Sequence, residues 1–302
     1  MTLSASPFDR FLDRAFTLAG DAAPDAQAAS TRMRAFETIL LLHLTARFAT
    51  GSFPDAAATP GLRSILAVGM GLCFALSFRP RLSPVAVASA LCLMLALLAN
   101  TFPGTGNHFF LELWALLLLL LVGRSTPAEA DLLQGALRWS IAIVLFYTGI
   151  QKMLYGTYLE AQYLTFEIAL KPEFESVFAP LIPAEELQRL RTIVPGRVGS
   201  GPFRTDAPLL LLASNLVYLF EIAAPVALLW WRSRRLAVIA VIVFTVAIQS
   251  GAREVYFGGL LVNWVLLFWP QSLHRRAPIG FAAYYAALAG LHFLAPGLLV
   301  MR

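Results

Sequence analysis

The chain has 302 residues, of which 58% are apolar and only 14% are charged. A soluble domain carries about 25% charged residues, so this composition excludes an ordinary cytosolic enzyme, a disordered chain and a fibrous protein. The net charge of +5 comes from arginines at the ends of apolar runs, which is typical of membrane orientation signals and gives no support to nucleic-acid binding.

The first 34 residues form an N-terminal amphipathic segment. Ser6 and Pro7 precede aromatic and aliphatic residues with helical spacing, and this pattern predicts a capped helix. The helix would lie either on the membrane surface or against the helical bundle. The segment contains four aspartates and no continuous apolar core, so we expect no cleavable signal peptide.

Nine apolar segments follow in chain order, so the sequence predicts an all-α polytopic bundle of about nine transmembrane spans in a single domain. Thirteen arginines fall on the side of the N-terminus, against three in the short segments on the opposite side. We therefore expect the N-terminus in the cytoplasm and the C-terminus outside. The segments are 35–50, 62–78, 84–102, 108–123, 135–152, 207–231, 235–250, 256–270 and 279–300.

The loop 153–206 is the longest segment between predicted spans. It holds six glutamates and five prolines, and residues 184–191 predict a short helix. About fifty residues are too few for an independent recognition domain, so we expect the loop to cap the outer mouth of the bundle.

His108 begins the fourth predicted span, and Glu112 follows one helical turn later on the same side. A carboxylate there could orient or charge the imidazole of an acid–base pair. The alternative is a histidine that caps a wet helix end.

Lys152 ends the fifth predicted span in a chain that otherwise uses arginine, with Lys171 the second of its two lysines. Desolvation can lower the pKa of a lysine far enough for its neutral amine to act as a base, whereas an arginine stays protonated. A lysine at a helix end can equally extend to the lipid headgroups, and the two interpretations stay open.

Two further positions carry ionisable groups. Glu221 lies in the middle of an apolar span, where a carboxylate must be protonated, paired or turned toward a polar cavity. It could take part in catalysis or form a structural hydrogen bond with another span. Arg253, next to Glu254 in an outer connection, could bind an anionic group or pair with its neighbour.

No metal site is expected. The four histidines are far apart in sequence, and no group of His, Cys and carboxylate residues has zinc or iron spacing. Cys73 and Cys92 lie inside apolar runs and are interpreted as small core residues, with a disulfide between neighbouring spans as the less favoured alternative.

Four stretches together resemble the vitamin K-dependent gamma-carboxylase family, through its bacterial relatives with a horizontally transferred transmembrane (HTTM) domain. They cover about residues 30–270, and their order and spacing are more specific than any single motif. The resemblance implies an integral protein of the bacterial inner membrane. The stretches are FALSFRPRLSPVAVASALCLMLALLAN, GNHFFLELWALLLLLL, FYTGIQKMLYGTYLEAQYL, and YLFEIAAPVALLWWRSRRL followed by VYFGGLLVNWVLLFWP.

The resemblance also implies roles for residues and a cofactor. Lys152 matches the base that deprotonates vitamin K hydroquinone, and His108, which follows Asn107, matches a second active-site residue. In that family the quinol anion reacts with oxygen to give a strong base, which removes a glutamate γ-proton before the carbanion takes up carbon dioxide. The cofactor carries the step that lysine alone could not perform.

We expect the side chains of His108 and Lys152 to approach within roughly 10 Å, because consecutive antiparallel spans place these helix ends on one face. A quinone is an apolar ligand, so its pocket beside Lys152 needs an apolar lining. The predicted lining residues are Phe109, Trp114, Tyr147 and Gln151.

The chain departs from the family at two points. We expect no counterpart of the large luminal domain that helps the carboxylases recognise their substrate, and Gln249 and Ala252 stand where the family has a His-x-x-Asn pattern. Two hypotheses therefore stay open. One is a quinol-dependent oxygenase or carboxylase-like enzyme acting on a peptide or lipid at the outer face. The other is a non-catalytic scaffold, or a partner subunit in peptide maturation or export; a transporter is a weaker third.

Overall fold

The protein is described from a computed structural model, which covers residues 26–50, 60–103, 106–193, 203–252, 254–269, 274 and 276–294. Within these ranges the chain forms twelve α-helices, one short 3-10 helix and no strand, so the predicted all-α fold is confirmed. The N-terminal amphipathic helix and Arg253 fall outside the described residues.

The helices are α2 (Ala26–Ala49), α3 (Pro60–Ser77), α4 (Ser83–Thr101), α5 (Asn107–Leu121), α6 (Pro127–Leu154), α7 (Gln162–Leu170), α8 (Pro172–Phe178), η1 (Ala179–Leu181), α9 (Ala184–Thr192), α10 (Pro208–Leu229), α11 (Arg234–Ala252), α12 (Val255–Leu266) and α13 (Ala277–Leu294). The helix predicted over 184–191 is confirmed as α9. Prolines stand in the first turns of several helices. Backbone N–H groups have no partner within the helix at these positions, so a proline there loses no helical hydrogen bond.

Four of the described helices, α4, α6, α10 and α13, are long and apolar enough to cross a membrane. Three shorter apolar stretches occur in α3, α5 and α12. A set of four such helices indicates an integral membrane protein.

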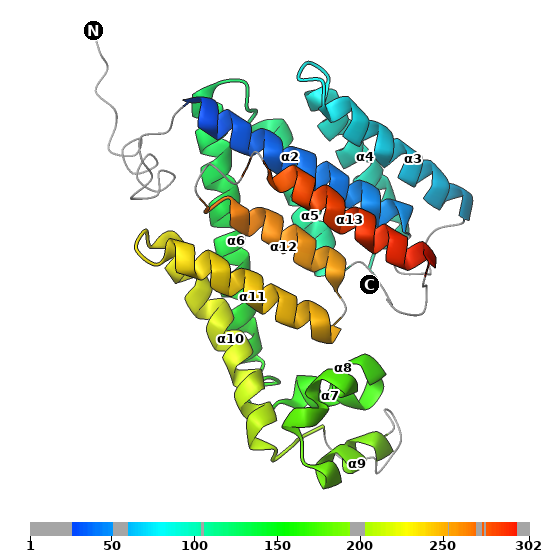
Figure 1. Cartoon of the computed structure of the whole chain (residues 1–302), viewed down its shortest axis with the longest axis vertical. Helices are drawn as coiled ribbons and strands as arrows, with labels where there is room; N and C mark the ends of the chain where they lie inside the picture. The colour runs from blue at the N-terminus through cyan, green and yellow to red at the C-terminus, as the bar shows by residue number, and fades with distance from the viewer. Residues whose placement is uncertain are drawn as a thin grey trace. The chain divides into compact units, whose positions relative to one another are not determined.

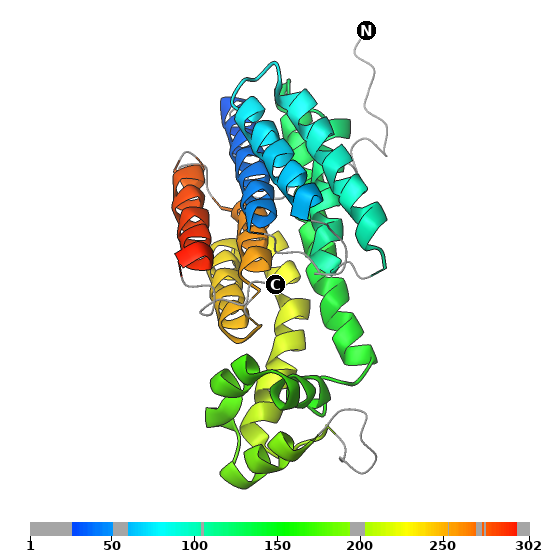
Figure 2. The ribbon, with the colours of Figure 1, turned by 90° about the vertical axis from the view of Figure 1, so that its right-hand side faces the viewer.

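The chain divides into two compact units. The first contains residues 1–139 and 254–302, and α2 is its central helix. There α2 packs against α3, α12 and α13, while α4 packs on α3 and on α5 (Figure 1; Figure 2 shows the same helices from the side). The side chains between α2, α12 and α13 form one core cluster around Tyr256 and Tyr285.

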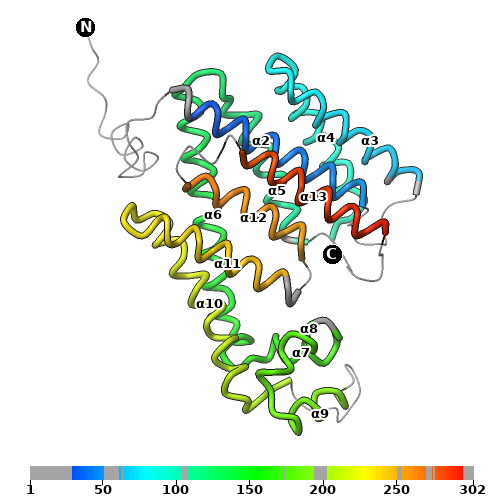
Figure 3. Tube along the Cα trace, in the orientation of Figure 1, coloured from blue at the N-terminus to red at the C-terminus, as the bar shows by residue number. Residues whose placement is uncertain are grey.

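The second unit contains residues 140–253. In it, α10 packs against α11, and α7, α8 and α9 lie together, as the tube in Figure 3 shows. The described part of the loop 153–206 is therefore a folded helical segment with a core of its own. That core is formed by Ala161, Leu164, Ile168, Phe174, Ile182, Leu190, Ile193, Ala207 and Leu210.

One expectation about a single residue needs correction. Cys92 is exposed, while Cys73 is buried as expected, and both thiols are free. Arg124 and Arg138, two of the thirteen arginines counted on the side of the N-terminus, have partners in the protein. The guanidinium of Arg124 pairs with the buried Glu37 carboxylate (Nε to Oε2, 2.7 Å), and Arg138 is buried and donates to the Leu267 carbonyl. A buried charge without a partner is costly, so these acceptors compensate for taking the guanidinium groups out of water.

Candidate functional site

Lys152 and Glu221 form an ion pair in the second unit. Lys152 Nζ lies 2.5 Å from Glu221 Oε1, so the last turn of α6 is joined to the middle of α10. The Glu221 side chain is 92% buried, whereas the Lys152 side chain keeps about a quarter of its surface exposed. The mid-span carboxylate therefore has the lysine as its partner, an arrangement that the sequence left open.

The approach of α6 to α10 depends on Gly149, one turn before Lys152. A Cβ atom at this glycine would lie 2.9 Å from the Tyr218 carbonyl oxygen and 2.8 Å from the Ile222 side chain. Real Cβ atoms do not come so close to backbone atoms, so only glycine lets the helices meet here. On α6 the close contact lies one turn before Lys152, and on α10 it lies at Tyr218 and Ile222, on either side of Glu221. It therefore brings the two charged groups within reach of each other.

The second carboxylate oxygen of Glu221 is free to bind a further donor. Oε2 is buried and has no hydrogen-bond partner among the described residues. The single proton of the nearby Thr148 hydroxyl can go either to Glu221 or to the Leu145 carbonyl, which lies 2.9 Å away, so the carboxylate shares this donor. A buried acceptor without a donor costs about 1–3 kcal/mol, so this oxygen is suited to a proton or to a ligand hydroxyl.

Aromatic residues lie next to the lysine. The ammonium of Lys152 is 5.0 Å from the centre of the Tyr158 ring, and that ring stacks on Tyr163 at 5.1 Å. Of the predicted lining residues on α6, Tyr147 is exposed and Gln151 is half-buried. The lysine therefore has a carboxylate on one side and an aromatic face on another.

A second polar cluster lies in the first unit, around the fully buried Glu112. Its carboxylate accepts hydrogen bonds from Arg47 and from His43 Nε2 (2.8 Å), both on α2. Arg47 also donates from its other terminal nitrogen to His108 Nε2 at 3.0 Å. Glu112 is thus linked to His108 through Arg47, and not directly as the spacing of the two residues suggested.

The contact with Arg47 determines which nitrogen of the neutral His108 ring carries a proton. Arginine can only donate, so Nε2 of His108 must be an acceptor, and the proton of the neutral ring lies on Nδ1. His43 donates from Nε2 to Glu112, and its Nδ1 lies 2.8 Å from the Tyr285 hydroxyl. His108 therefore offers a donor at Nδ1, and its basic nitrogen is already engaged.

Sequence reasoning missed Arg47 and His43. The available signal was that these two ionisable residues stand four apart within a predicted span, hence on one face of a helix. Of the other predicted lining residues, Phe109 is buried with the Arg47 guanidinium 5.8 Å from its ring centre, and Trp114 is half-exposed. Asn107 is the first residue of α5, and nothing is described of its side chain.

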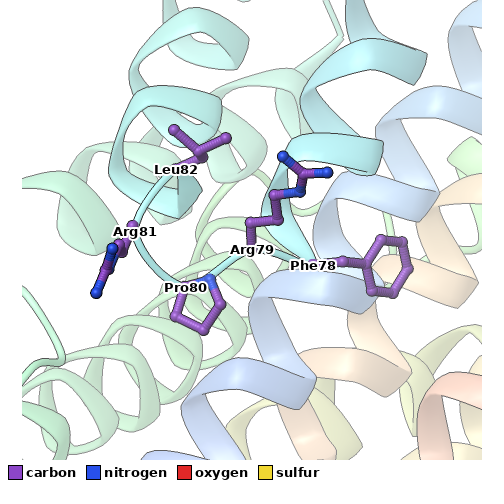
Figure 4. A pocket seen from close by; sticks show the side chains of 5 residues that line it. All are labelled: Phe78, Arg79, Pro80, Arg81 and Leu82. Carbon is purple, nitrogen blue, oxygen red and sulfur yellow. The ribbon is translucent and has the colours of Figure 1, made fainter.

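His108 and Lys152 belong to different compact units, so their mutual approach stays a prediction, and so does the apolar pocket beside Lys152. A hollow of about 470 Å³ is described elsewhere, at the turn between α3 and α4. Figure 4 shows that five consecutive residues, 78–82, line it and that their side chains point in different directions. Such a surface hollow around one turn has no convergent polar groups and is not a cofactor site.

The described residues contain no group of three or more His, Cys, Asp or Glu side chains that could hold a metal ion. No protein-family model matches the chain, and no curated protein or solved structure matches it either. The resemblance found in its motifs therefore stays a prediction.

Proposed function

We propose that the chain is a membrane-embedded, quinol-dependent enzyme of the oxygenase or carboxylase type, related to the vitamin K-dependent gamma-carboxylases through the HTTM domain. Its substrate would be a peptide or lipid at the outer face of a bacterial inner membrane. We retain the topology of about nine spans with a cytoplasmic N-terminus. The observation that supports the proposal best is the pair of Lys152 and Glu221, with one buried carboxylate oxygen still lacking a donor.

The residues around Lys152 fit a reduced quinone. A phenolic hydroxyl is the kind of donor that the buried Oε2 of Glu221 lacks, and the Tyr158 ring beside the ammonium offers an aromatic surface. Lys152 and Glu221 would hold the hydroxyl end of the ligand. When bound, the quinol would supply an acidic hydroxyl and the reducing equivalents for oxygen chemistry.

The pair can produce a base without placing a net charge in an apolar environment. Transfer of one proton from Lys152 Nζ to Glu221 Oε1, 2.5 Å away, leaves a neutral amine beside a neutral carboxyl group. Such an amine can accept a proton from a ligand hydroxyl, as a general base does. Glu221 then acts as the group that takes and returns the lysine proton.

His108 would contribute a hydrogen bond and not a second base. Its Nε2 is occupied by Arg47, and the proton on Nδ1 can be donated to an oxygen atom of a ligand. The nearby positive charge of Arg47 makes this position suited to an oxygen that carries negative charge.

A non-catalytic scaffold is the second candidate. Buried ion pairs also occur as structural links, and breaking one by removing a partner costs about 3–5 kcal/mol. In that case Lys152 and Glu221 would serve only to hold α6 against α10.

The deciding experiment compares Lys152→Arg and Lys152→Ala with the wild type. Purified protein is supplied with reduced quinone, oxygen and labelled carbon dioxide, and oxidised quinone and incorporated label are measured. A base contributes typically ~10²–10⁴-fold in rate, so both variants should lose activity by that factor, because a guanidinium stays protonated. Lys171→Arg, at the second lysine of the chain, is the matched control and should stay active.

The same variants test the scaffold. If Lys152 is only a structural partner, Lys152→Arg keeps its charge and behaves like the wild type, while Lys152→Ala lowers the free energy of unfolding. Full activity of Lys152→Arg would refute the proposed role of the lysine as base.

A further inference from the structure

Helix α7 turns apolar side chains outward. Tyr163, Phe166 and Leu170 follow one another at three- and four-residue spacing, so they share one face of the helix. All three are exposed, with relative accessibilities of 36–40%. Two of them are large aromatic residues, which a helix facing water seldom presents together.

The buried residues of α7 include polar groups as well as apolar ones. Thr165 is fully buried and its hydroxyl lies 2.7 Å from the Phe203 carbonyl, while the buried Glu167 pairs with Lys171. The neighbouring α9 has the arrangement expected in water: Leu190 is buried, and Glu185 and Gln188 are exposed. The outward apolar face is therefore a property of α7 and not of the whole segment.

The exposed face of α7 continues an apolar surface that begins on α6, one of the four helices long enough to cross a membrane. The last turn of α6 exposes Leu154, and Tyr155 and Leu159 are exposed in the connection that follows. Tyr158, from the same connection, stacks on Tyr163 of α7.

The composition of this surface is typical of one environment. Tyrosines are enriched where a membrane meets water, because the ring prefers the apolar side and the hydroxyl the polar side. Three tyrosines, Tyr155, Tyr158 and Tyr163, belong to this surface.

We propose that α7 lies in the headgroup–acyl boundary of the membrane that α6 crosses, with Tyr163, Phe166 and Leu170 inserted among the lipids. The helix is too short to span the bilayer, and burial of one apolar face is how such helices bind a membrane surface. The inference does not depend on the proposed enzymatic activity or on the orientation of the chain.

Spin labelling of the full chain in phosphatidylcholine nanodiscs tests the proposal. Cys73 and Cys92 are first replaced by alanine, and a single nitroxide is attached at Phe166→Cys or, as matched control, at Gln188→Cys on α9. Oxygen concentrates in the acyl region, and a water-soluble nickel chelate stays outside. The label at 166 should collide more often with oxygen than with the chelate, and the label at 188 should show the reverse order.

Leu170→Cys, on the same face, serves as a second labelled position if Phe166→Cys does not fold. If the labels at 166 and 170 are as accessible to the chelate as the label at 188, this face of α7 lies in water. That result would overturn the proposal. Poor access of both reagents to the label would mean that protein covers this face of α7. Spin–spin broadening in addition would identify that protein as a second copy of this chain. Either result would overturn the proposal.

Discussion

His108 is held on two sides. Arg47 donates to its Nε2, and Gly106 lies against the Nδ1 edge of the ring. Gly106 has an extended backbone conformation (φ −69°, ψ 152°) that any residue can adopt. A substitution there acts only through the contact with the histidine.

The first prediction concerns Gly106→Ala. The added Cβ would lie 2.8 Å from Cε1 and 3.2 Å from Nδ1 of His108, so the ring must turn away from Arg47. Loss of a hydrogen bond to a charged group costs about 1.5–3 kcal/mol of unfolding free energy. Ring ¹⁵N shifts of His108 should show that Nε2 has lost its donor. Gly280→Ala, where a Cβ meets nothing within 4 Å, is the control and should leave these shifts unchanged.

The second prediction concerns pH and His274, which lies between α12 and α13. Burial, together with the charges of Arg32 and Arg138, lowers the pKa of His274 from 6.5 to about 4. The unfolded chain therefore binds a proton below pH 6.5 while the folded chain does not. The contribution of the neutral His274 to the free energy of unfolding is complete above pH 6.5, and it is lost as the pH falls toward 4.

Between pH 7 and pH 5 this loss amounts to about 2 kcal/mol. His274→Gln keeps an N–H donor for the Trp269 carbonyl but does not titrate. Unfolding of the detergent-solubilised protein should thus be less sensitive to pH in the variant. Equal pH dependence of the two proteins would show that His274 titrates normally in the folded state.

At the scale of elements, the contact between α6 and α10 is the most constrained. Gly149 has no room for a side chain because the backbone of α10 lies against it at Tyr218 and Ile222. The ion pair joins Lys152, one turn later on α6, to Glu221, which lies between these two contact residues on α10. The geometry of the candidate site is thus set by a residue that takes no part in its chemistry.

The third prediction is that Gly149→Ala separates α6 from α10. Overpacking of this kind costs about 1–3 kcal/mol. A double-mutant cycle between Lys152→Ala and Glu221→Gln should give a coupling energy that is smaller in the Gly149→Ala background. Gly290→Ala on α13, where a Cβ has open space, should change neither stability nor coupling. An unchanged coupling energy in Gly149→Ala would contradict the positioning role of the glycine.

The sequence predicted the apolar helices well, because hydropathy and turn residues determine where such helices begin and end. The segment predicted over 207–231 corresponds to α10 at Pro208–Leu229, and that over 84–102 to α4 at Ser83–Thr101. The segments predicted from 135 and 35 begin eight or nine residues earlier in the structure, at Pro127 and Ala26. These first turns carry polar residues, which a search for apolar runs does not detect.

The sequence could not show which ionisable residues pair with one another. Lys152 and Glu221 are 69 positions apart, as are His43 and Glu112. Which of these groups meet depends on the faces along which the helices pack, and the spacing within one helix carries no information about that. The spacing of His108 and Glu112 showed that they share a helix face, but not that Arg47 lies between them.

At the scale of the whole molecule, each of the two units has a core of its own. The core of the second unit includes residues from α7, α8, α9 and the start of α10, with Leu190 fully buried in it. The described part of the loop 153–206 is thus stabilised by its own packing and can respond to a mutation separately from the first unit.

The fourth prediction is that Leu190→Ala loosens this segment alone. Truncation of a buried leucine costs about 2–5 kcal/mol. Amide hydrogen exchange should become faster in α7 and α9 and stay unchanged in α2 and α5. Gln188→Ala, at an exposed position of the same helix, should have no effect. Faster exchange throughout both units would show that they unfold together.

The charged residues of α2 pair with residues that are synthesised after them. Glu37 contacts Ser83 and Arg124, and Arg47 contacts Glu112, and all three partners leave the ribosome later than α2 itself. His43 also contacts Tyr285, near the end of the described chain. Each of these groups is costly to bury before its partner exists. The first described helix to be made is therefore among the last to reach its final surroundings, and a chain interrupted before Arg124 would leave the Glu37 carboxylate without its guanidinium.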